Sequence, residues 1–118
     1  MYSVNTTFFP FRLSLRDRKP VQLKVELINR NQQEKMVSLE LLLSRQLALD
    51  KSGLKATAMH RITSFKPNER KEFFFEIFPK QFAEHGTYPV RVKVLQHYQN
   101  FDLVEREFTK NLELTVQD

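Results

Sequence analysis

The stretch GTYPVRVKV, residues 86–94, sets the pattern from which the fold follows. Apolar side chains stand at every second position from Tyr88 to Val94, and Pro89, Arg91 and Lys93 stand between them. Successive side chains of a β-strand point to opposite faces, so this alternation predicts a strand with one face against a core and the other in water.

The same alternation recurs in both directions along the chain. It predicts further strands over residues 9–15, 21–27, 37–49, 54–62, 73–77 and 108–116. The predicted core face of the first of these strands consists of Phe9, Phe11, Leu13 and Leu15. Pro10 suits an edge position there because it lacks an amide donor.

Three features of this strand pattern stay open. The leucine-rich residues 45–58 alternate more weakly and could instead contain a short helical turn. Residues 101–107 either begin the last strand or form one arm of a hairpin. The strand over residues 54–62 pairs with the strand over residues 73–77 or belongs to the other sheet.

Short strands separated by turns, with no convincing helical period, predict two antiparallel sheets packed face to face. The chain has 118 residues, with only two glycines and five prolines and no linker-like stretch. This length can bury one core without disulfides. We therefore predict a single all-β sandwich domain over residues 1–118.

Two segments resemble corners of immunoglobulin-like sandwiches. In that fold a tyrosine at the start of strand F donates its hydroxyl back across the E–F corner, two residues before the cysteine of antibodies. Tyr88 and Val90 have this spacing. The segment ITSFKPNE, residues 62–69, is similar to the D–E corner of prokaryotic members, with Asn68 where glycine is usual. Asparagine tolerates the left-handed conformation.

Together with PVQLKVELIN, residues 20–29, these corners resemble the CARDB-like and fibronectin-like modules of archaea and bacteria. The glycine typical after the asparagine of the second strand is missing. The resemblance implies an antiparallel immunoglobulin-like β-sandwich of about seven strands in two sheets. It also implies a non-catalytic spacer, adhesion or interaction module. It carries over no functional residue, and Tyr88 is its structural marker.

Residue types needed for catalysis or for cofactor binding are sparse. Cysteine is absent, and His60, His85 and His97 lack the spacing of a metal-binding motif. No phosphate-binding glycine loop and no nucleophile elbow occurs. We therefore predict no cofactor, no metal site, no small-molecule substrate and no enzymatic activity.

The chain is basic, with a formal net charge of +5 and a pI near 9.6. Its cations are dispersed among apolar residues, as on the outer faces of strands, which favours a solvated exterior over a nucleic-acid footprint. The alternative is a polyanion-binding surface near the first turn. That surface would consist of Arg12, Arg16, Arg18 and Lys19.

Several apolar residues fall out of phase with the predicted core faces. If Phe73 and Phe75 face the core, then Phe74 and Phe78 face outward, and Ile28 faces outward on a neighbouring strand. Such a patch is typical of a partner surface. The alternative is that residues 2–9, or the loop after residue 78, cover these side chains.

These observations predict a module that presents a rigid β surface to a protein partner or to a second copy. A related hypothesis is that the open edge of its last strand pairs with that partner. No window approaches the roughly 18–20 apolar residues of a membrane helix. We expect a cytoplasmic protein if the chain is complete, and a cell-surface or extracellular one if it is a piece of a longer protein.

Overall fold

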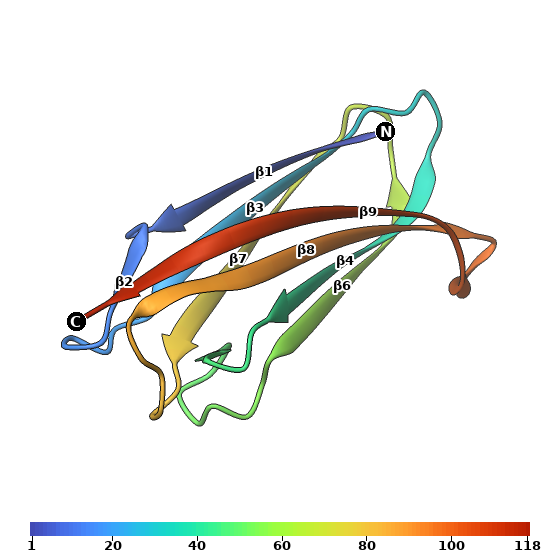
Figure 1. Cartoon of the computed structure of the whole chain (residues 1–118). Helices are drawn as coiled ribbons and strands as arrows, with labels where there is room; N and C mark the ends of the chain where they lie inside the picture. The colour runs from blue at the N-terminus through green and yellow to red at the C-terminus, as the bar shows by residue number, and fades with distance from the viewer.

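The computed structural model describes residues 1–118, which form nine strands and no helix (Figure 1). The strands are β1 (Tyr2–Phe9), β2 (Arg12–Ser14), β3 (Val21–Asn29), β4 (Lys35–Leu43), β5 (Leu47–Ala48), β6 (Thr57–Phe65), β7 (Arg70–Pro79), β8 (Gly86–Tyr98) and β9 (Asn100–Gln117). The predicted all-β class is confirmed.

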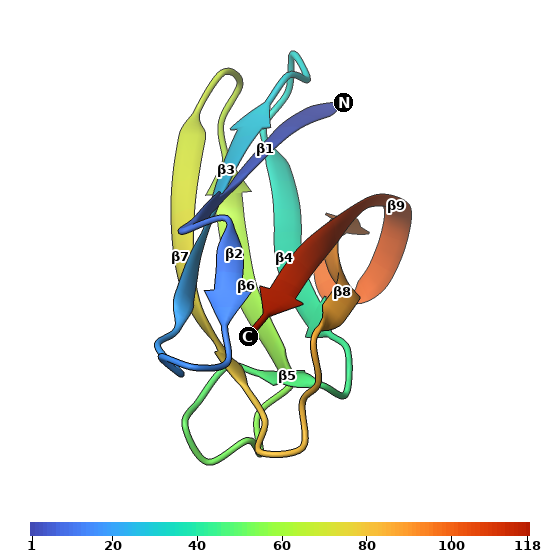
Figure 2. The same cartoon turned by 60° about the vertical axis from the view of Figure 1, so that its left-hand side comes forward.

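The strands make two sheets packed face to face (Figure 2). One sheet has the order β1-β3-β7-β5 and the other the order β2-β9-β8-β4-β6. All pairs are antiparallel except β2 with β9, which run parallel. The strands predicted over residues 21–27 and 73–77 are thus neighbours, as β3 and β7, with β1 beside β3.

The core lies between the sheets and follows the period of two. In β3 every second residue from Val21 to Asn29 is buried, and in β8 the same holds from Val90 to Gln96. Each fully buried aliphatic side chain stabilises the fold by about 2 kcal/mol relative to an exposed one. The alternation read from the sequence is therefore the alternation that the core uses.

The prediction for the first strand, residues 9–15, is wrong in its N-terminal half. Phe9 and Phe11 are each 76% exposed, whereas Leu13 is buried as expected. The cause is a bend at Pro10, which cannot donate to a strand ladder. β1 pairs with β3 and β2 pairs with β9, so the chain crosses from one sheet to the other at this bend.

The strand predicted over residues 37–49 is two strands in different sheets. β4 ends at Leu43, the chain turns with the Leu47 amide donating to the Ser44 carbonyl, and β5 then pairs with β7. Residues 45–58 contain no helical turn. The strand expected over residues 54–62 is β6, which pairs with β4 and not with β7.

Both predicted corners are confirmed. The Tyr88 hydroxyl donates to the Glu84 carbonyl at 2.6 Å, closing the turn before β8. Asn68 has φ of 63°, the left-handed conformation expected at that position. In the same turn the Lys66 amide donates to the Glu69 carboxylate at 2.9 Å, and this hydrogen bond stabilises the connection between β6 and β7.

We predict that Tyr88→Phe lowers the free energy of unfolding by about 1 kcal/mol, because it removes one hydrogen bond and leaves the ring in place. Urea unfolding measures this difference. Tyr98→Phe is the matched control, since Tyr98 is exposed and its hydroxyl makes no hydrogen bond. Equal stabilities of the two variants would contradict a structural role for the Tyr88 hydroxyl.

Candidate functional site

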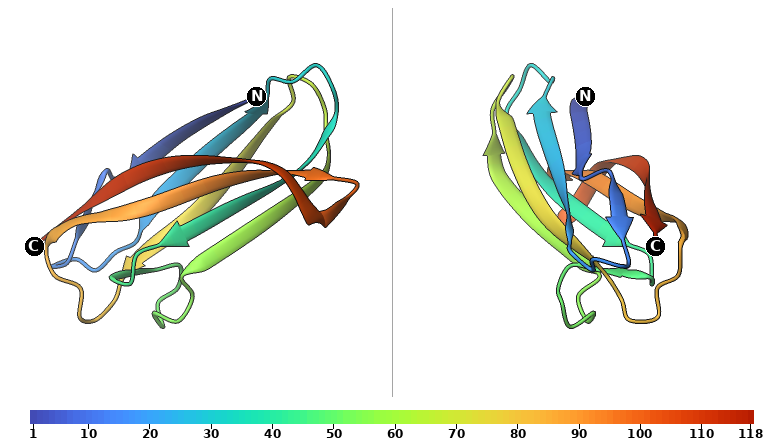
Figure 3. Two further views of the ribbon diagram at one scale, coloured as in Figure 1. Left: turned by 45° about the vertical axis from the view of Figure 1, so that its right-hand side comes forward. Right: turned by 90° about the vertical axis from the view of Figure 1, so that its left-hand side faces the viewer.

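One side of the sandwich has two unpaired strand edges. β7 pairs with β3 from Arg70 to Ile77, and on its other side β5 reaches only Phe78 and Pro79. β6 pairs with β4 and has no neighbour on its outer side. β6 and β7 are joined by a short turn and run along the same side of the molecule (Figure 3). This open side therefore displays free backbone donors and acceptors.

Phe74 lies at the centre of the open side. Its side chain is 55% exposed, and it borders a hollow of about 250 Å³. The hollow is lined by Leu49, Lys55, Ala58, His60, Phe74, Phe75 and Glu76. The His60 ring is 5.0 Å from the Phe73 ring and 5.7 Å from the Phe75 ring, measured between centroids. Leu49, Ala58, Phe74 and Phe75 thus supply the apolar part of the lining, and Lys55, His60 and Glu76 supply the polar part.

The structure separates Phe74 from the other two residues of the predicted apolar patch. Ile28 is half-buried and lies four residues along β3 from Lys24, the partner of Phe74. Four strand residues span about 13 Å. The residue pair between them is Glu26 opposite Glu72. The sequence does not indicate this separation, because it depends on the register between β3 and β7.

Charged contacts occupy the surface between Ile28 and Phe74. Arg70 lies 3.3 Å from the Glu26 carboxylate, and Lys24 lies 3.7 Å from Glu72. Residues 2–9 do not fold over this face; they extend the sheet as β1, with Ser3 opposite Ile28. Of the three patch residues, only Phe74 is exposed on the open side.

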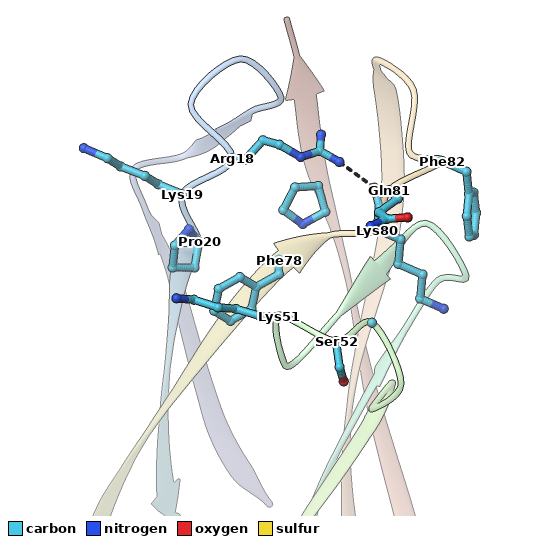
Figure 4. A pocket seen from close by; sticks show the side chains of 11 residues that line it. Arg18, Lys19, Pro20, Lys51, Ser52, Phe78, Lys80, Gln81 and Phe82 are labelled. Atoms are coloured by element: carbon cyan, nitrogen blue, oxygen red, sulfur yellow. Dashed lines mark hydrogen bonds between the residues drawn. The ribbon is translucent and has the colours of Figure 1, made fainter.

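Phe78 is half-buried, opposite Ala48 of β5, and lines a second and larger hollow at the end of the sandwich. This basic cleft has a volume of about 580 Å³ (Figure 4). It is lined by Arg18, Lys19, Pro20, Lys51, Ser52, Gly53, Phe78, Pro79, Lys80, Gln81 and Phe82.

The basic residues predicted near the first turn divide between two places. Arg18 and Lys19 line the basic cleft, and the Arg18 guanidinium donates to the Lys80 carbonyl at 3.2 Å. Arg12 and Arg16 are exposed and are not part of its lining. Lys51 and Lys80 join the cleft from turns remote in sequence, and no local pattern marks them.

A partly buried polar cluster ties the N-terminus to the second sheet. The Tyr2 hydroxyl donates to the Gln96 side chain at 2.7 Å, and the Gln96 amide donates to Glu105 at 2.8 Å. Burial raises the pKa of Tyr2 to about 12. Because β1, β8 and β9 each supply a member, this cluster fixes how the two sheets meet at this end.

Ser38 and His97 form a second buried contact, with 2.7 Å between Oγ and Nε2. Ser38 is 1% exposed, and the Phe101 ring packs 5.1 Å from the imidazole. No third polar side chain reaches His97 Nδ1. A nucleophile needs access to its substrate and an oriented base, and neither condition is met here. No three His, Asp or Glu side chains gather into a set that could hold a metal ion.

Comparison with known proteins places the fold. No family model and no curated protein matches the sequence. A structure of α-2-macroglobulin from Escherichia coli, from domain MG7 to the C-terminus, matches with a TM-score of 0.71 and 13% identity, over 98% of this chain and 16% of that chain. A CARDB domain from Pyrococcus furiosus, solved in complex with di-metal ions, matches with a TM-score of 0.66 and 15% identity, over 99% and 93%.

BslA, a bacterial hydrophobin, matches with a TM-score of 0.55 and 11% identity, over 99% of this chain and 95% of that one. At these identities the likeness defines the fold alone. The chain is an immunoglobulin-like β-sandwich of the kind found in prokaryotic CARDB and α-2-macroglobulin domains, which confirms the predicted resemblance. It spans only a small part of the α-2-macroglobulin chain.

The structure has no helix with the length and hydropathy to cross a bilayer.

Phe74 and Phe75 are adjacent on β7, so substituting each in turn tests which face of the strand points into the core. We predict that Phe74→Ala changes the free energy of unfolding by less than about 1 kcal/mol, the span of strand propensities at exposed positions. Phe75→Ala is expected to cost about 3–5 kcal/mol, because Phe75 belongs to the core. Chemical denaturation compares the two, and similar losses would contradict the orientation of β7 described here.

Proposed function

We propose that this chain is a non-catalytic interaction module, and that its open side binds an extended segment of a protein partner. The observation that carries the proposal is the position of Phe74, exposed beside a hollow with apolar and polar lining residues and next to the unpaired edge of β7. In this binding mode main-chain hydrogen bonds supply affinity, and pockets for alternate side chains supply specificity.

The edge of β7 carries few of the features that guard an open edge. Proteins usually guard open edges with lysine, proline or inward-pointing charges. The stretch from Glu72 to Phe78 contains neither lysine nor proline. The free edge of β9 differs, because it carries alternating charges at residues 105–107, and the Lys110 ammonium donates to the Val4 carbonyl at 2.9 Å. A partner strand therefore meets fewer obstacles at β7 than at β9.

The chemistry of the hollow defines the segment that fits. A strand added beside β7 turns every second side chain toward the hollow, where Phe74, Phe75 and Leu49 offer apolar contact. Lys55 and Glu76, which also line the hollow, suit polar or charged residues of the segment. We expect a bound segment with one central apolar residue flanked by polar ones.

The likeness to known folds supports an interaction role in a general way. The E. coli α-2-macroglobulin structure uses this fold as one part of a much longer chain. An interaction module contacts its partners through its surfaces and strand edges. The same role for this chain needs no catalytic group, and the open side supplies a suitable surface.

The proposal is tested with a phage-displayed library of random peptides selected on the folded protein. We predict that the selected peptides share a central apolar residue and bind Phe74→Ser at least about tenfold more weakly, since the variant replaces the exposed ring that an apolar side chain would contact. Calorimetry with synthetic versions of the peptides measures the loss.

Phe11→Ser is the matched control, because Phe11 is also a highly exposed phenylalanine and lies on the segment between β1 and β2. It is expected to bind the peptides as the wild type does. Equal binding by Phe74→Ser and the wild type would overturn the proposal. Light scattering shows whether a second copy occupies the open side instead. A dimer that Phe74→Ser converts to a monomer would mean that the open side binds a second copy of this chain and not a partner peptide.

A further inference from the structure

The geometry of the basic cleft points to a second binding site, distinct from the open side. We propose that it binds a compact polyvalent anion of the phosphate type. Three turns converge there: residues 18–20 before β3, residues 51–53 after β5, and residues 79–82 at the end of β7. Each turn contributes at least one cation and none contributes an acid.

The cations of the cleft have no acidic partners. The ion pairs of this structure involve Lys24, Arg70, Lys71 and Lys93, none of which lines the cleft. Arg18, Lys19, Lys51 and Lys80 therefore raise the local potential, and none of them has an ion-pair partner. Like charges gathered in one hollow repel one another, and an anion bound among them relieves that repulsion.

The acid next to Lys51 is already engaged in its own turn. The Asp50 carboxylate accepts hydrogen bonds from the Gly53 amide at 3.0 Å and the Leu54 amide at 3.1 Å, and from the Ser52 hydroxyl at 2.7 Å. These bonds, led by the one from Ser52, lower the pKa of Asp50. Asp50 thus shapes the turn that presents Lys51, and its oxygens are committed to that turn.

The backbone of the cleft is held in place, whereas its lysine ammonium groups make no hydrogen bond or ion pair. The Arg18–Lys80 hydrogen bond joins two of the turns, and the Lys80 amide donates to the Gln46 carbonyl at 3.1 Å. Arg18 itself adopts the left-handed conformation, with φ of 51°. Figure 4 shows its guanidinium directed at the Lys80 turn, with the lysine side chains spread around the rim. Their flexible stems allow the ammonium groups to close on a ligand.

The donor set suits an anion of high charge, such as a chain of phosphate groups. The planar fork of arginine matches carboxylates and phosphates alike, and the Arg18 guanidinium is already bonded to Lys80. The other cations are lysines, whose point charges suit phosphate groups. The volume of about 580 Å³ falls in the range of small-molecule clefts. Arg12 and Arg16 lie outside it, so the cations surround a hollow and do not form the stripe expected for a nucleic acid.

The test is isothermal titration calorimetry of the whole chain with sodium tripolyphosphate in dilute salt, with citrate as the carboxylate comparison. Saturable binding with one site is expected, weaker for citrate, and decreasing as salt screens the charges. A unit charge about 4 Å from an anion in water changes affinity by roughly fivefold, so the double variant Lys51→Gln/Lys80→Gln should bind about twenty-five times more weakly.

The control is Lys66→Gln/Arg91→Gln, which removes the same net charge from the β6–β7 turn and from the outer face of β8. It should bind tripolyphosphate as the wild type does, and circular dichroism confirms that both variants are folded. Equal weakening in both double variants would overturn the proposal, because binding would then follow net charge. Absence of binding in dilute salt would overturn it as well, as would tighter binding of a single-stranded oligonucleotide that depends on Arg12 and Arg16.

Discussion

Two strands with the same alternation, β3 and β8, bury their apolar faces in one core, and the rest of the structure depends on this contact. Each has a strand on both sides, so its backbone hydrogen bonds are made within its sheet and its side chains are free to form the core. The outer strands complete the two layers and can bend, shorten or end without loss of the core. This freedom explains why the irregular elements β2 and β5 lie at the margins.

Both candidate sites follow from this arrangement. A sandwich of open sheets must have edges, and here the edges of β6 and β7 fall on one side, where Phe74 and the hollow beside it lie. It must also have turns at its ends, and three of them bring unpaired cations around one cleft. Neither site needs a change in the core. The fold thus carries interaction surfaces at its periphery, as expected when function resides in sites placed on a stable scaffold.

The sequence predicted the features that depend on local chemistry. The strand period, the Tyr88 corner and the left-handed Asn68 each rest on a few neighbouring residues. It failed where long-range pairing decides the outcome. Phe9 and Phe11 continue the alternation of Leu13, but the bend at Pro10 moves the chain between sheets. The distance between Ile28 and Phe74 depends on register, and the basic cleft depends on turns that meet only in the folded chain, so neither could be read from the sequence.

The most direct test of the open side is residue-resolved amide hydrogen exchange of the chain alone, followed by nuclear magnetic resonance. Between Arg70 and Ile77 every second amide points away from β3 and should exchange fast, whereas β3 and β8 should be protected at nearly every position. This alternating pattern in β7 is the result that an unpaired edge predicts. Uniform protection along β7 would show that the edge is already covered, and would contradict its availability to a partner strand.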